Sequence, residues 1–142
     1  MIQRIQSVYL FLALLALGAL FSHLPLIRLI DAAGTATPGN QGMLIAQEVL
    51  IGLSAFITLF SIFLYANRKR QMMAVKGAIV LTVLALIFIG VDYFVLNAQV
   101  GANQLQVNPF ALVGTVALIL QVLGHRGIMA DEKLVREADR LR

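Results

Sequence analysis

The chain has 142 residues, of which 60% are hydrophobic and only 13% are charged, and its mean hydropathy is +0.88. A soluble domain of this length needs far more polar surface, so the composition excludes one and predicts an integral membrane protein. The absence of cysteine excludes disulfides and thiolate metal ligands, and two histidines alone argue against a structural zinc site.

Four apolar stretches are predicted to cross a membrane as helices. A helix rises about 1.5 Å per residue, so about 20 residues cross a hydrocarbon core that is ~30 Å thick. The fourth stretch is the shortest, and Asn108 followed by Pro109 is typical of a helix start. The predicted spans are residues 7–27, 43–66, 75–96 and 109–124. Residues 28–42, between the first two spans, are rich in Gly, Ala, Thr and Pro and predict a mobile loop.

Lysine and arginine gather on one side of these spans. Ten of the 11 lie near the termini or near the loop between the second and third spans, and only Arg28 lies on the other side. The positive-inside rule therefore places both termini and this loop in the cytoplasm. The expected fold is an all-α membrane protein in which residues 1–127 form an up-down-up-down bundle of four transmembrane helices.

Residues 128–142 are predicted to form a short, separate amphipathic helix in the cytoplasm. Apolar residues recur in it at helical spacing, and Glu132 precedes Arg136 by one helical turn. Such a helix is either a membrane-surface anchor or solvated tail, or a docking segment for a soluble partner or another subunit. The candidate docking residues are Leu134, Arg136, Ala138, Arg140 and Leu141.

Both ends of the chain resemble a known family. Residues 1–10 read MIQRIQSVYL, residues 131–136 read DEKLVR, and residues 139–142 read DRLR. With four spans between them, these motifs resemble an uncharacterised family of short inner-membrane proteins found mainly in the Bacteroidetes, described as domain of unknown function 4293. The resemblance implies a location in the bacterial inner membrane. It brings no activity, cofactor or catalytic residue.

Two acidic residues lie within the predicted spans, where a charge at the helix centre costs roughly 2.5–3.5 kcal/mol. Glu48 lies near the start of the second span and Asp92 near the end of the third, so antiparallel helices bring both to similar depth. We therefore predict an outer-leaflet polar cluster of His23, Arg28, Glu48 and Asp92. The alternative is that each side chain reaches interfacial water or pairs structurally.

A polar stripe follows one face of the second span. It could line a hydrated path, but hydrogen bonding between helices is the commoner role, and we interpret it in that way. Gln121 and His125 of the fourth span are interpreted similarly. The stripe consists of Gln47, Ser54, Thr58, Ser61 and Tyr65.

No catalytic, phosphate-binding or dinucleotide-binding motif is found, so we expect no enzyme, no metal and no cofactor. Nucleic-acid binding is not expected either, because the single basic run lacks interleaved aromatic residues. The expected function is a non-enzymatic accessory or assembly subunit that contacts lipid, other membrane subunits or further copies of itself. The alternative is a small oligomeric transporter or channel that uses the outer-leaflet carboxylates. A transporter usually needs a carboxylate near the midplane, and the span centres carry no charge.

Overall fold

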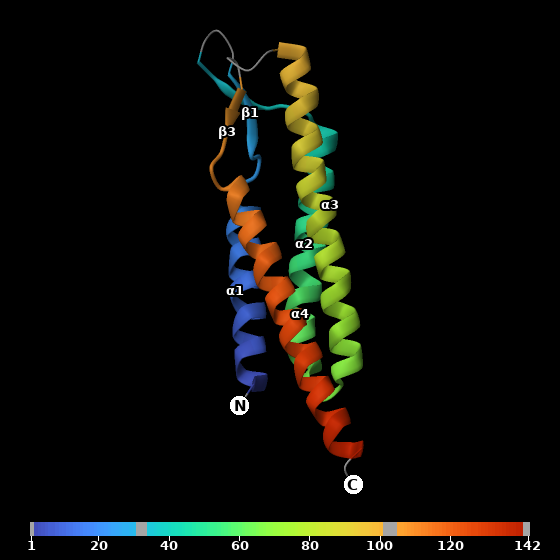
Figure 1. Cartoon of the computed structure of the whole chain (residues 1–142). Coiled ribbons are helices and arrows are strands. Elements are labelled where there is room, and N and C mark those ends of the chain that lie inside the picture. Colours follow the sequence, from blue (N-terminus) through green and yellow to red (C-terminus); the bar gives the residue numbers. More distant parts are fainter. Residues whose placement is uncertain (1, 31–33, 101–104, 141–142) are drawn as a thin grey trace.

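In a computed structural model of the chain, four long helices stand side by side and a small sheet covers one end (Figure 1). The structure describes residues 2–30, 34–100 and 105–140. The start of the first helix and the end of the last both lie at the end opposite the sheet, which we call the terminus end. The helices are α1 (Ile2–Ser22), α2 (Gln41–Phe63), α3 (Arg68–Val100) and α4 (Ala111–Arg140), and the short 3-10 helix η1 (Leu64–Ala66) follows α2.

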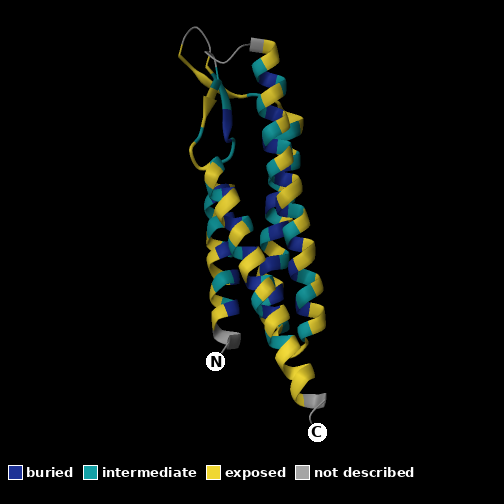
Figure 2. Ribbon diagram, in the orientation of Figure 1, coloured by how far each residue is buried: buried dark blue, intermediate teal, exposed yellow. Residues whose placement is uncertain are grey.

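The helices pack around the bundle in chain order. α1 packs on α2 and α4, and α3 packs on the same two neighbours. Successive helices run in opposite directions (Figure 1), which confirms the predicted up-down-up-down bundle. All four helices are long and apolar enough to cross a membrane. Figure 2 shows exposed residues along the outer sides of the helices, and many of them are large and apolar, including Phe56, Phe94 and Leu112. An outer surface of this kind suits lipid and not water.

The sheet corrects the all-α prediction. Strands β1 (Ile27–Ile30), β2 (Ala36–Pro38) and β3 (Leu105–Val107) form an antiparallel sheet in the order β2-β1-β3. The predicted first span ran to residue 27, but α1 ends at Ser22, since Pro25 cannot continue a helix and the apolar residues after it form a strand. Part of the loop predicted to be mobile is strand β2.

The separate C-terminal helix predicted for residues 128–142 is not seen. Instead α4 runs as one helix of 30 residues from Ala111 to Arg140. Gly124 and Gly127 lie within it, but a glycine costs a helix only about 1 kcal/mol relative to alanine, and no proline interrupts the segment. The transmembrane part and the charged part are therefore one continuous element.

Two glycines allow α4 to approach its neighbours closely. A Cβ added at Gly114 would lie 2.7 Å from Cδ2 of Leu86 and 3.2 Å from Cδ2 of Leu20. A Cβ added at Gly124 would lie 2.9 Å from Cδ2 of Leu10. Small residues of this kind bring transmembrane helices together, because van der Waals contact replaces the hydrophobic effect in lipid.

We expect Gly114→Val to lower the free energy of unfolding in detergent micelles by about 1–3 kcal/mol, because the added atoms overpack the contact with Leu86. The measurement is circular dichroism during titration with a denaturing detergent. Gly18→Val is the matched control, because Gly18 is exposed and nothing lies within 4 Å of its added Cβ. Equal losses in the two variants would contradict the assignment of Gly114 to a helix contact.

Candidate functional site

Four polar side chains inside the bundle join three of its helices. Ser54 and Thr58 of α2, Thr82 of α3 and Gln121 of α4 are all buried, and we call them the core polar network. Gln121 Nε2 donates to Ser54 Oγ at 3.2 Å and to Thr58 Oγ1 at 3.0 Å. Gln121 Oε1 accepts a hydrogen bond from Thr82 Oγ1 at 2.9 Å. The oxygens of Ser54 and Thr82 lie 2.7 Å apart, which closes the network.

The core polar network needs no water. A side-chain amide has two N–H donors and one carbonyl acceptor, and Gln121 uses all of them on the three hydroxyl groups. A buried amide without partners costs several kcal/mol in an apolar surrounding, so these contacts decide how α4 is turned. This arrangement fits the interpretation of the stripe as hydrogen bonding between helices.

The stripe ends nearer the sheet than predicted. Ser61 is buried, but its hydroxyl donates to the Thr58 carbonyl of the same helix at 2.7 Å, and it forms no hydrogen bond to another helix in the described part of the chain. Tyr65 is 70% exposed, so it does not belong to the buried face.

Nearer the sheet, the same face of α2 contacts a buried carboxyl of α3, that of Asp92. Gln47 Nε2 donates to Asp92 Oδ2 of α3 at 3.3 Å, and the two residues are only 2% and 5% exposed. The other carboxyl oxygen, Asp92 Oδ1, is buried and has no hydrogen-bond partner. The sequence pattern assigns Gln47 to the stripe and Asp92 to the cluster. It does not predict that they pair, because the pairing depends on how α2 and α3 are rotated about their axes.

The predicted outer-leaflet cluster does not assemble as one set of contacts. Within residues 2–30, 34–100 and 105–140, no hydrogen bond or ion pair joins any two of its four members. His23 stacks on Phe110, with 3.6 Å between ring centroids, and its Nδ1 lies 2.9 Å from the Ala19 carbonyl oxygen. Arg28 lies on β1 and Glu48 is half-buried on α2. A functional role for the cluster stays a prediction.

Ion pairs gather at the terminus end. Arg68 at the start of α3 pairs with Asp131 of α4, with 3.3 Å between Nη2 and Oδ2. The predicted pairing of Arg136 with Glu132 is confirmed at 3.1 Å. Of the predicted docking residues, Leu134, Arg136 and Ala138 are exposed, the side chain of Arg140 is not described, and Leu141 lies outside the described residues.

One contact at this end was not foreseen. Gln6 of α1 is 5% exposed, and its Nε2 donates to the Gly127 carbonyl oxygen of α4 at 2.9 Å. A Cβ at Gly127 would lie 2.8 Å from Cγ of Gln6, so the glycine makes room for this side chain. The sequence signal is limited to a glutamine directly before the first predicted span and a glycine after the fourth.

We expect Gln121→Leu to destabilise the folded bundle by about 1–2 kcal/mol, because Ser54, Thr58 and Thr82 lose their shared partner. The measurement is the free energy of unfolding in micelles. Gln99→Leu, which removes an exposed amide on α3, is the control. A loss no larger than that of the control would contradict the network, as would full additivity with Thr82→Val.

Comparison with known proteins gives one result that covers nearly the whole chain. The family model described as Domain of unknown function (DUF4293) matches residues 2–141, which include all four helices and the sheet. No curated protein and no solved structure matches the chain. The chain belongs to the DUF4293 family, whose description assigns no activity.

Proposed function

We propose that this protein is a multi-pass protein of the bacterial inner membrane, with both termini in the cytosol, and that it is a non-enzymatic accessory or assembly subunit of a membrane complex. Four helices able to cross a membrane support the location. The orientation is supported by charge, since ten of the 11 lysines and arginines belong to segments at the terminus end. The choice of the bacterial inner membrane is supported by what the family resemblance implies.

The closed core polar network is the observation that carries the accessory role. A transport path needs polar groups that are free to meet water or an ion. In this bundle both N–H donors and the carbonyl oxygen of the Gln121 amide form hydrogen bonds with Ser54, Thr58 and Thr82. Polar side chains that satisfy each other's hydrogen bonds hold helices in place. This suits a protein that acts by binding partners through its outer surfaces.

A surface for a partner is available where α4 leaves the bundle. A helix of 30 residues is about 45 Å long, which exceeds a hydrocarbon core of ~30 Å. The pair between Arg68 and Asp131 marks where α3 begins, and α4 continues beyond it with Leu134 and Val135 exposed. A hollow of about 460 Å³ adjoins this projecting segment; it is lined by Ala66, Asn67, Arg68, Lys69, Glu132 and Val135.

A second function, a small oligomeric transporter or channel, is favoured by the Asp92 carboxyl. Asp92 Oδ1 is buried without a partner, and Gln47 beside it continues the polar face that leads to Ser54. Purification as a homo-oligomer alone, together with ion flux in proteoliposomes that Asp92→Asn abolishes, would support this function over the accessory role.

The orientation can be tested with single cysteines, because the chain contains none. We expect a membrane-impermeant maleimide to label Thr37→Cys on β2 in intact cells, because the sheet end faces the periplasm. Lys69→Cys and Glu137→Cys, both at exposed positions, are expected to react only after permeabilisation. The opposite labelling pattern would overturn the orientation.

The accessory role predicts a stable complex that depends on the projecting end of α4. We expect Leu134→Ala combined with Val135→Ala to weaken partner binding about tenfold or more, because both side chains are exposed there. The measurement is quantitative mass spectrometry of the complex purified in mild detergent. Leu112→Ala with Val116→Ala is the matched control, since these residues are exposed on the same helix, on the part of it that packs in the bundle and away from the projecting end.

Two results would contradict this prediction. Purification of the protein without any stoichiometric partner removes the accessory role. Equal partner binding by the variant and its control would show that the partner contacts the protein elsewhere than at the projecting end of α4.

A further inference from the structure

Arg28 is a cation without a counter-charge at the sheet end of the molecule. It is half-buried on β1, and no ion pair of its guanidinium occurs in the described part of the chain. A guanidinium is always charged and carries five N–H donors in a rigid fork. Partial burial removes water from these donors, so the group gains from an anion close by.

The sheet gathers two amide side chains beside this cation. Arg28 pairs directly with Gln106 of β3 in the antiparallel register, so their side chains share one face of the sheet. Asn108 follows two residues later and returns to that face. Asn108 Oδ1 accepts a hydrogen bond from the Phe110 backbone N–H at 3.0 Å, which leaves its Nδ2 group free to donate elsewhere.

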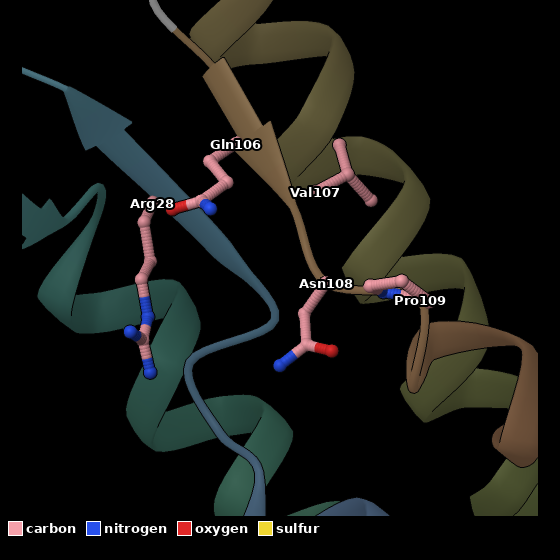
Figure 3. Close-up of a pocket in the computed structure, with 5 residues that line it drawn as sticks. All are labelled: Arg28, Gln106, Val107, Asn108 and Pro109. Carbon is pink, nitrogen blue, oxygen red and sulfur yellow. The ribbon is translucent and has the colours of Figure 1, made fainter.

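These side chains enclose a small hollow of about 220 Å³, which we call the Arg28 hollow. Figure 3 shows the Arg28 side chain extending from β1 toward the helices, and the amide nitrogen of Asn108 turned toward the side on which Arg28 lies. The lining residues are Arg28, Gln106, Val107, Asn108 and Pro109. Its polar groups include one permanent cation and two amides, and none of the described residues that line it is acidic.

We propose that the Arg28 hollow binds a phosphate group. The guanidinium supplies the charge and a fork of N–H donors that matches two phosphate oxygens, and the Asn108 and Gln106 amides supply neutral donors beside it. The volume admits a phosphate with part of a headgroup and excludes acyl chains.

The position of the hollow favours the phosphate of a phospholipid over free phosphate. α1 has 21 residues, so it is about 32 Å long and matches the thickness of the hydrocarbon core. The Arg28 hollow lies just beyond the end of α1 and just before the start of α4, where lipid headgroups meet the protein. The proposal concerns a site distinct from the projecting end of α4 and stands without the accessory role.

The test is native mass spectrometry of the full-length protein in detergent during titration with phosphatidylglycerol. We expect Arg28→Gln to weaken the tightest lipid-binding event about tenfold or more, because one charged hydrogen-bonding partner is lost. Arg126→Gln is the matched control, since it removes an exposed arginine near the terminus end, and it leaves this event unchanged. Arg28→Lys keeps the charge without the fork and gives an intermediate affinity.

Further ligands identify the source of the phosphate, and a second variant keeps the test valid if Arg28→Gln does not fold. Diacylglycerol, which lacks phosphate, is expected to bind equally to wild type and Arg28→Gln. Competition by millimolar inorganic phosphate supports the site and assigns it to free phosphate, whereas failure to compete assigns it to the lipid. If Arg28→Gln unfolds, Gln106→Ala at an exposed position carries the test with an expected loss of about threefold. Phosphatidylglycerol affinity that is unchanged in every folded variant, or lost equally in Arg126→Gln, overturns the proposal.

Discussion

The amide of Gln121 must find its hydrogen-bond partners inside the protein, because hydrocarbon offers none. It finds them on two neighbouring helices at once, Thr82 of α3 and the two hydroxyl residues Ser54 and Thr58 of α2. Turning α4 by one residue, about 100°, would carry the amide away from all three. Apolar side chains packed in lipid tolerate many rotations, so this single group selects one arrangement of three helices.

The remaining helix is held in a different way. α1 takes no part in the core polar network and meets α4 through buried leucines, among them Leu10 and Leu20, which lie against Gly124 and Gly114. Gln6 adds one hydrogen bond to the α4 backbone at the terminus end. The bundle therefore combines the core polar network among α2, α3 and α4 with an apolar contact between α1 and α4. α4 takes part in both the network and this contact, so it is the helix that positions the other three.

The sequence predicts the parts of this fold that depend on local composition. Span number, span order and the hydrogen-bonding role of Ser54 and Thr58 follow from hydropathy and from spacing along one helix. The sheet does not follow, because Ile27–Ile30 is apolar and continues the first span in a hydropathy reading, and its pairing with Leu105–Val107 joins segments far apart in the chain. The sequence predicts a shared cluster for His23 and Asp92, but in the structure these two side chains contact Phe110 and Gln47, partners that depend on helix rotation and loop folding.

The two ends of the bundle differ in how their charges are balanced. At the terminus end three cations have counter-ions within the protein, because Arg68, Lys133 and Arg136 each pair with a carboxylate of α4. At the sheet end Arg28 lies beside two amide side chains, and the nearby carboxyl of Asp92 accepts a hydrogen bond from Gln47. Within the described residues, the terminus end thus neutralises part of its positive charge inside the fold, whereas Arg28 has no ion pair there, and the anion that we propose for it comes from its surroundings. A bilayer surface holds phosphate at that depth, so the same lipid that serves as solvent for the helices also supplies the missing charge.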